Sequence, residues 1–272
     1  VLGTLIGGGK FGGKNLIPKI IHYVWIGGAK PDSVQKNIDN WKKVLAGYTF
    51  QEWNEHNWDI SKNQFAKYFY DKKQFAFVGD AIRVDVLNRI GGIYLDTDVE
   101  VYKPFNSLLK EQLVFGRIYN NAIGTATILA EKNTRMMNDL SNMYKAFDLT
   151  QLEDNTIDKV NNGIFTRYLL DKHVGFSFGN TKQRLKNGAL ILPKQYFEVP
   201  AMWFETGTFA THHVAGSWQD KKQESNNESK GLKSGVKGLI RSAFPVAIAR
   251  YENLKGGQSN SIAKEFGPKA PQ

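Results

Sequence analysis

The sequence contains no cysteine, which excludes disulfides and thiolate metal sites and leaves the redox compartment open. It also lacks a long hydrophobic run. The longest lies near residues 243–249 and has no more than about eight residues, far short of the roughly 20 that a membrane-spanning helix needs. The glycine-rich residues 1–15 lack the basic start and the long apolar centre of a signal peptide. We therefore expect a flexible leader without a function, and a cytoplasmic location.

The chain has 272 residues, of which 41% are hydrophobic, so it can bury one large core, with or without an appendage. Half of its net charge of +10 lies near one end, since residues 220–272 hold ten Lys or Arg against five Asp or Glu. Such a basic tail favours an acidic partner, either membrane phospholipid or nucleic acid. No groove-reading or base-stacking motif is present, so we expect no nucleic acid partner.

Strand-like and helix-like patterns alternate along the chain. The strand-like segments are residues 16–28, 48–54, 93–98, 113–119, 123–130 and 189–197, and the helix-like segments are residues 33–46, 60–73, 74–92, 133–146 and 157–171. This alternation predicts an α/β layered domain with a largely parallel sheet. We expect the domain to span residues 16–219, after the leader at 1–15. A polar linker and a basic, partly amphipathic helical tail would follow at 220–272.

The stretch RIGGIYLDTDVEVYKPF, residues 89–105, places Asp96 and Asp98 at the end of an apolar strand. Ligands of open α/β sheets bind beyond the carboxyl ends of the strands. Residues two apart on a strand share a face, so both carboxylates would point to the same side, where they suit Mg²⁺ or Mn²⁺. The alternative is a strand-end turn whose aspartates cap the next element.

Sixteen residues upstream, VGDAIRVDVL places Asp80 and Arg83 three apart on one face of a predicted helix. They could form a surface ion pair. They could instead point into the same pocket as Asp96 and Asp98, where the arginine would bind phosphate and the aspartate sugar hydroxyls.

The segment DAIRVDVLNRIGGIYLDTDVEVYKP resembles the Asp-x-Asp sugar-binding region of glycosyltransferase family 32. IPKIIHYVWIGG, WKKVLAGYTFQEWNE, ILPKQYFEVP and HHVAGSW are similar to other blocks of that family, in the same order, so the resemblance covers roughly Leu16 to Trp218. It implies a GT-A fold, a nucleotide-sugar donor, a divalent metal and transfer with retention of configuration. The family includes capsular and lipopolysaccharide sugar transferases and fungal mannosyltransferases, and clostridial toxin glucosyltransferase domains are distant relatives.

The resemblance also implies roles for residues. Asp80 and Arg83 would contact the donor sugar, Asp96 would bind ribose or metal-bound water, and Asp98 would ligate the metal. The expected donor-binding residues are Trp25, Tyr94, Asn162, Ser217 and Trp218. In many GT-A enzymes a late histidine completes the metal site, and imidazole suits Mn²⁺ better than Mg²⁺. Of the two adjacent histidines, the prediction favours His213 over His212.

The expected function is a metal-dependent retaining glycosyltransferase of surface polysaccharide synthesis, for example of a capsule. It would move a hexose from a nucleotide sugar, UDP-sugar favoured over GDP-mannose, to a glycan or lipid-linked acceptor. Two alternatives stay open: a toxin-like protein glycosyltransferase and a non-catalytic nucleotide-sugar-binding module. In the tail, Lys233, Lys237 and Arg241 form a basic stripe. This stripe is typical of a helix docked on the domain, or of a helix that lies on the inner face of an anionic membrane.

Overall fold

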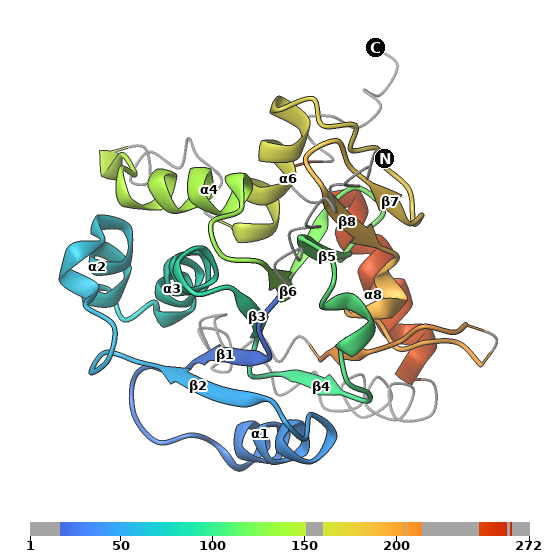
Figure 1. Cartoon of the computed structure of the whole chain (residues 1–272), viewed down its shortest axis with the longest axis horizontal. Helices are drawn as coiled ribbons and strands as arrows, with labels where there is room; N and C mark the ends of the chain where they lie inside the picture. Colours follow the sequence, from blue (N-terminus) through green and yellow to red (C-terminus); the bar gives the residue numbers. More distant parts are fainter. Residues whose placement is uncertain (1–16, 151–159, 204, 214–244, 260–261, 263–272) are drawn as a thin grey trace, which may run out of the picture.

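The computed structural model describes residues 17–150, 160–203, 205–213, 245–259 and 262 (Figure 1). The α-helices are α1 (Asp32–Val44), α2 (Gln64–Asp71), α3 (Phe75–Arg89), α4 (Arg135–Lys145), α6 (Asn161–Asp171) and α8 (Pro245–Ser259). The strands are β1 (Ile20–Val24), β2 (Thr49–Trp53), β3 (Gly92–Leu95), β4 (Val99–Val101), β5 (Leu113–Arg117), β6 (Ile123–Ala130), β7 (Gln183–Arg184), β8 (Ala189–Leu192) and β9 (Ala210–His212). Short 3₁₀ helices lie at Ile60–Lys62, Asn106–Leu108 and Lys194–Tyr196.

Seven of these strands form one sheet in the order β2-β1-β3-β6-β5-β8-β7, and β4 pairs with β9 in a second, two-stranded sheet. β1 runs parallel to β2 and β3, and β5 runs parallel to β8. β6 is antiparallel to both of its neighbours because it follows β5 as a hairpin and then pairs with β3. The predicted α/β class is confirmed, with a sheet that mixes parallel and antiparallel pairs.

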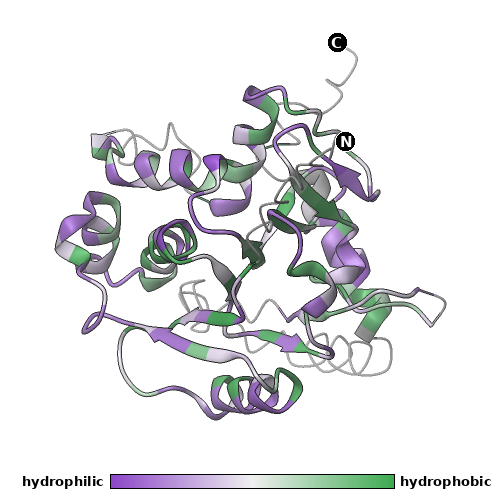
Figure 2. Cartoon of the chain, in the orientation of Figure 1, coloured by the Kyte–Doolittle hydropathy of each residue, from purple (hydrophilic) through white to green (hydrophobic). Residues whose placement is uncertain are grey.

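Hydrophobic residues are concentrated in the central strands of the large sheet (Figure 2), and the buried apolar side chains form two core clusters. Along β6, Ile128 belongs to one core cluster and its neighbour Leu129 to the other, as the alternation of a strand requires. Helices α2, α3, α4 and α6 contribute to the first cluster, and α1 contributes Ile38 and Trp41 to the second. Within α3 every residue from Val78 to Asn88 is buried, so its polar side chains must find partners inside the protein.

Several elements differ from their predicted extents, and two of them have a clear local cause. The helix expected over residues 60–73 is divided at Asn63, whose side chain caps α2 by accepting a hydrogen bond from the Ala66 amide at 2.9 Å. The strand expected over residues 189–197 ends at Leu192, because Pro193 follows it and begins a 3₁₀ turn.

Helix α8 lies within the predicted C-terminal tail, and it packs on the domain. Its Arg250 donates from Nε and Nη2 to the carbonyl oxygen of Pro200 at 3.1 and 3.0 Å and pairs with Glu205. Asn253 of the same helix donates to the carbonyl oxygen of Ile118. The basic stripe at 233, 237 and 241 lies outside the described residues, and the predicted domain boundaries stay predictions. Among the helices described, none combines the length and the apolar character that crossing a membrane requires.

The turn from α3 into β3 depends on Gly91 and Gly92. Their φ angles are +73° and +116°, which favour glycine. A Cβ at Gly91 would lie 2.7 Å from the Lys132 amide nitrogen, and one at Gly92 would lie 2.7 Å from the Ile20 carbonyl oxygen. The two glycines therefore let the chain reverse tightly enough for β3 to pair with β1, with the Asp-x-Asp stretch directly after it.

The turn is also held by His22, which is fully buried. Its Nε2 lies 2.8 Å from the Gly91 carbonyl oxygen, and its Nδ1 accepts from the Trp53 indole at 3.1 Å. Nε2 therefore carries the proton. Burial lowers the pKa of His22 below its ordinary value of 6.5, although the Gly91 carbonyl opposes this shift.

This burial predicts a stability change with pH. Below pH 6.5 the unfolded chain binds a proton at His22 that the folded chain excludes, so the free energy of unfolding falls as the pH is lowered. We expect His22 to lower the free energy of unfolding by up to about 1.4 kcal/mol per pH unit below pH 6.5. Urea unfolding of the wild type and of His22→Gln at pH 7.5 and 5.5 measures it. Equal losses in both proteins would contradict the prediction.

Candidate active site

Asp96 and Asp98 lie in a tight turn between β3 and β4. β3 ends at Leu95, and the turn closes with a hydrogen bond from the Val99 amide to the Asp96 carbonyl oxygen at 3.0 Å. The two carboxylates therefore converge through the turn rather than through strand alternation. Helix α1 fixes the same segment from outside: Asn37 donates to the Thr97 carbonyl at 2.9 Å, and Trp41 to the Val99 carbonyl at 2.8 Å.

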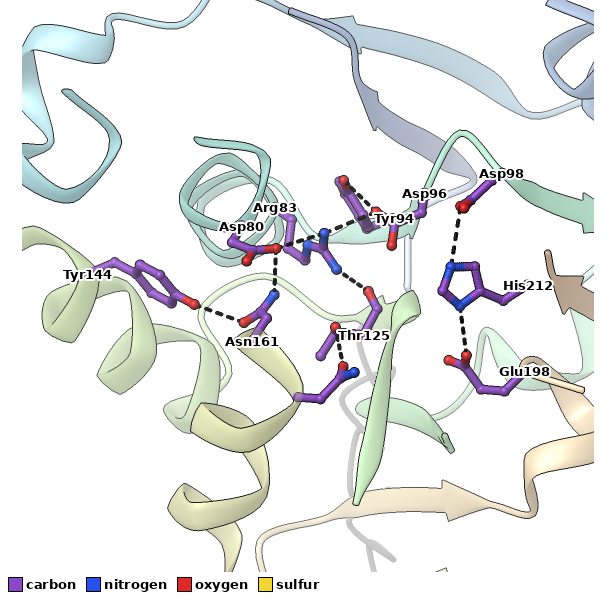
Figure 3. A network of polar contacts seen from close by, with 11 residues as sticks. Asp80, Arg83, Tyr94, Asp96, Asp98, Thr125, Tyr144, Asn161, Glu198 and His212 are labelled. Atoms are coloured by element: carbon purple, nitrogen blue, oxygen red, sulfur yellow. Dashed lines mark hydrogen bonds and ion pairs between the residues drawn. The ribbon is translucent and has the colours of Figure 1, made fainter. Parts of the chain in front are cut away.

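Helix α3 brings Asp80 and Arg83 to this turn, as the second reading of their spacing predicted (Figure 3). Arg83 Nη2 lies 2.9 Å from Asp80 Oδ1 and 3.0 Å from Asp96 Oδ1, and Nη1 donates to the Thr125 carbonyl at 2.5 Å. Tyr94 donates to the same Asp96 oxygen at 3.0 Å, and its ring lies beneath the guanidinium at 4.4 Å. Arg83 is only 5% exposed, so it holds two carboxylates in place from inside the protein.

Helix α6 adds a residue that the sequence prediction missed. Asn161 donates from Nδ2 to Asp80 Oδ1 at 3.2 Å and accepts from the Tyr144 hydroxyl at 2.8 Å (Figure 3). Its neighbour Asn162, which is predicted to bind the donor, accepts from the Thr125 hydroxyl at 2.6 Å. Both asparagines start α6, and its first turn decides which of them reaches Asp80. The letters NN in the sequence do not distinguish them.

A histidine faces the two aspartates from β9. His212 Nε2 lies 3.3 Å from Asp98 Oδ1, while Nδ1 lies 3.0 Å from Glu198 Oε2 (Figure 3). One ligand atom from each of Asp96, Asp98 and His212 lies within 4.8 Å of the other two. β9 holds this position because it pairs antiparallel with β4, with His212 opposite Val99.

The structure places His213, the histidine that the prediction favoured, in another position. Its exposed ring bonds Glu100 at 2.9 Å, and only its backbone amide touches the turn, by donating to the Asp98 carbonyl at 3.0 Å. Successive side chains of an extended chain point to opposite faces, so only one of the two histidines can face the aspartates. That residue is His212, which replaces His213 in the candidate metal site.

The charge balance of the site fits a bound cation. Four carboxylates gather here; among the described residues Arg83 pairs with Asp80 and Asp96, and the His212 ring lies between Asp98 and Glu198. Two carboxylates and an imidazole form an oxygen and nitrogen donor set that suits Mn²⁺ and also accepts Mg²⁺. The residues therefore fit a divalent metal held by Asp96, Asp98 and His212.

Burial and neighbouring charges shift the pKa values of these groups. Burial raises the pKa of Asp80 to about 7, although Arg83 opposes the shift. It likewise raises the pKa of Asp96, again against the effect of Arg83. For His212 burial lowers the pKa, but hydrogen bonds to Asp98 and Glu198 outweigh it, and the pKa lies well above its ordinary value. All three shifts show that the site is poorly solvated and rich in negative charge.

The predicted donor-binding residues are only partly described. Trp25 is half-buried after β1, where its indole donates to the Gly28 carbonyl at 2.8 Å. Tyr94 lies in the cluster, bonded to Asp96. Ser217 and Trp218 lie outside the described residues.

Comparison with known proteins identifies this region. Residues 31–115 match the family model described as "Glycosyltransferase sugar-binding region containing DXD motif". This match confirms the recognition made from the sequence as far as it reaches: the chain carries a DXD-containing sugar-binding region like that of glycosyltransferases.

Two curated relatives extend the comparison. "Uncharacterized glycosyltransferase L373" of Acanthamoeba polyphaga mimivirus is 32% identical over 126 residues, which cover 40% of this chain and 50% of the relative. "Subversion of eukaryotic traffic protein A" of Legionella pneumophila is 23% identical over 161 residues, 46% of this chain and 24% of that protein. The chain thus spans half or less of the length of these relatives. Among solved structures, the PaToxG glycosyltransferase is 18% identical with a TM-score of 0.46, covering 58% of this chain and 70% of that one.

Proposed function

We propose that the protein is a metal-dependent GT-A glycosyltransferase that moves a hexose from a nucleotide sugar to an acceptor. One observation carries the proposal: the DXD aspartates Asp96 and Asp98 converge with His212 beside the buried pair Asp80 and Arg83. A divalent cation held there would bind the donor diphosphate and stabilise the negative charge that develops on the leaving group. We favour a UDP-sugar over GDP-mannose, and expect retention of configuration from the family resemblance alone.

The chain's own residues orient the donor. Asp80 Oδ1 is occupied by Arg83 and Asn161, while its other carboxylate oxygen is left for a sugar hydroxyl. A buried carboxylate that is held in one rotamer discriminates between hydroxyl positions. A sugar whose hydroxyl does not reach the second oxygen leaves that oxygen without a hydrogen bond. Trp25, half-buried at the end of β1, would stack on the base.

We assign Arg83 a different task from the phosphate contact expected at first. Both of its terminal nitrogens are engaged by protein groups: Asp80 and Asp96 on one, the Thr125 carbonyl on the other. Its positive charge still acts on the site in this poorly solvated setting. We therefore propose that Arg83 orients the two aspartates and neutralises part of their charge. No side chain is assigned as a general base, since the leaving phosphate can accept the proton of the acceptor hydroxyl.

A donor screen tests the proposal. Purified protein is incubated with Mn²⁺ and each of the common UDP-, GDP- and CMP-sugars, and the release of free nucleotide is scored. We expect slow hydrolysis of one donor, lost on addition of a chelator. No release from any donor, together with no thermal shift from UDP or GDP with Mn²⁺, would favour a non-catalytic nucleotide-sugar-binding module instead.

The acceptor has two candidates. Family resemblance supports a glycan or lipid-linked acceptor in surface polysaccharide synthesis, such as a capsule. The likeness to a Legionella protein named for the subversion of eukaryotic traffic supports a toxin-like enzyme that glycosylates a protein. Transfer of radiolabelled sugar from the donor identified above, to lipid extracts in one assay and to eukaryotic lysate in another, separates the two.

The basic tail supports a membrane partner for the lipid-linked acceptor, at the inner face of an anionic membrane. We expect the triple charge reversal Lys233→Glu, Lys237→Glu and Arg241→Glu to lower binding to anionic liposomes about a hundredfold or more, at about 1 kcal/mol for each basic residue. The reversal leaves α8 in place, which deletion of the tail would not. Reversing the exposed Lys42 and Lys43 of α1 is the matched control. Equal liposome binding by all three proteins would contradict a membrane role.

A further inference from the structure

Glu198 is a buried carboxylate that no sequence motif singled out. It follows the 3₁₀ turn after β8, and its side chain is 1% exposed. Its Oε2 lies 3.0 Å from His212 Nδ1, and its Oε1 is buried without a hydrogen-bond partner among the residues that the structure describes. Burying a carboxylate with one unsatisfied oxygen costs free energy. The contact with His212 must offset much of that cost.

We propose that Glu198 is the positioning residue of the metal site and that it sets the site's affinity through His212. The inference rests on the proposed function, because it assumes that His212 Nε2 ligates a divalent cation. A histidine that ligates a metal usually donates its second ring N–H to a carboxylate, which fixes the ring orientation and the tautomer and strengthens the ligand nitrogen. Here Glu198 accepts the hydrogen bond from His212 Nδ1, and so leaves His212 Nε2 to bind the metal.

The geometry of the second ring nitrogen supports this assignment. With the proton on Nδ1, the Nε2 lone pair faces Asp98 Oδ1 at 3.3 Å. Two lone pairs at that separation repel unless a cation, either a proton or a metal ion, lies between them. Glu198 therefore turns His212 so that its Nε2 joins the aspartates of the DXD turn.

Gly124 on β6 makes room for this arrangement. A Cβ added at Gly124 would lie 1.9 Å from Glu198 Oε1, and 2.5 Å from its Cδ. The atoms nearest to the added Cβ all belong to the Glu198 side chain. A side chain at position 124 would therefore displace the carboxylate from His212. Glycine at position 124 is thus required for the contact between Glu198 and His212.

A matched pair of side chains lies directly after β9. His213 and Glu100 form the same kind of contact at 2.9 Å, but both side chains are exposed, and His213 is not part of the group formed by Asp96, Asp98 and His212. Substitution of Glu100 removes a His–Glu contact of equal chemistry without touching the site. It therefore controls for general effects of losing a carboxylate on these strands.

The test is a titration of Mn²⁺ into the wild type and the variants Glu198→Gln, Glu198→Ala, Gly124→Ala and Glu100→Gln, followed by electron paramagnetic resonance of free Mn²⁺. We expect the Kd for Mn²⁺ to rise about 10- to 100-fold in the first three variants, with alanine above glutamine, and to stay unchanged in Glu100→Gln. Pulsed resonance gives a second readout: coupling of Mn²⁺ to a directly bound imidazole nitrogen is present in the wild type and weak or lost in Glu198→Ala.

The outcomes separate the inference from the proposed function. Glutamine is nearly isosteric with glutamate, and thermal unfolding reports whether each variant folds. Folded Glu198→Gln and Glu198→Ala variants that bind Mn²⁺ as tightly as the wild type, with the nitrogen coupling intact, would overturn the role of Glu198 alone. A wild type that binds no Mn²⁺ would overturn the metal site itself, and this inference with it.

Discussion

Asp98→Asn is expected to lower the rate of donor turnover at least about a thousandfold, equivalent to about 4 kcal/mol of transition-state stabilisation. Asparagine keeps the shape of the side chain, and the loss of one ligand charge weakens both the metal and its effect on the leaving group. The fold should persist, because the substitution removes charge from a site in which carboxylates already outnumber cations. Nucleotide release in the donor assay measures the rate, and thermal unfolding measures the fold.

Two controls make this result specific. Glu100→Gln removes an exposed carboxylate two residues further along the chain and should leave turnover unchanged. Excess chelator should reduce the wild type to the rate of Asp98→Asn, while adding little to the loss in the variant itself. Turnover by Asp98→Asn at the wild-type rate would exclude the carboxylate as a metal ligand.

Arg83→Met should destabilise the protein by about 3 to 5 kcal/mol at neutral pH, the loss typical of breaking a buried ion pair from one side. The guanidinium is 5% exposed and bonds two carboxylates, Asp80 and Asp96, which would lose their compensating charge. Methionine retains most of the buried volume, so the loss reports charge and hydrogen bonding rather than a cavity. Urea unfolding measures the change.

The matched control lies on the same helix. Arg89 pairs with Asp85 at 3.0 Å, but its side chain is 49% exposed, so Arg89→Met should cost about 1 kcal/mol or less. If Arg83→Met were no more destabilising than Arg89→Met, the two aspartates would not depend on Arg83. The orienting role assigned to this residue would then fail.

The parts of the site that the sequence predicted are those set by local periodicity. The three-residue spacing of Asp80 and Arg83 on a long helix fixes one shared face, and the apolar run before Asp96 fixes the end of a strand. The glycine pair between them indicates the tight reversal that brings helix and strand together. Each of these features depends on a short stretch of sequence. In the structure Arg83 contacts both Asp80 and Asp96, as expected.

The parts that the sequence did not predict depend on long-range pairing. Which histidine of THH faces the aspartates is decided by the register of β9 on β4, more than 100 residues apart in the chain. The contact of Glu198 with His212 requires a bare backbone at Gly124 on a third strand. Neither relation leaves a local pattern, because short strands such as β9 carry too few residues to reveal their phase.

Crystals soaked with Mn²⁺ and UDP test the central claim most directly, through anomalous diffraction at the manganese absorption edge. We predict one strong anomalous peak at bonding distance from Asp98 and from His212 Nε2, with the diphosphate beside it and Glu198 still on Nδ1. A peak bonded to other residues, or bound UDP without any peak at Asp98, would contradict the account.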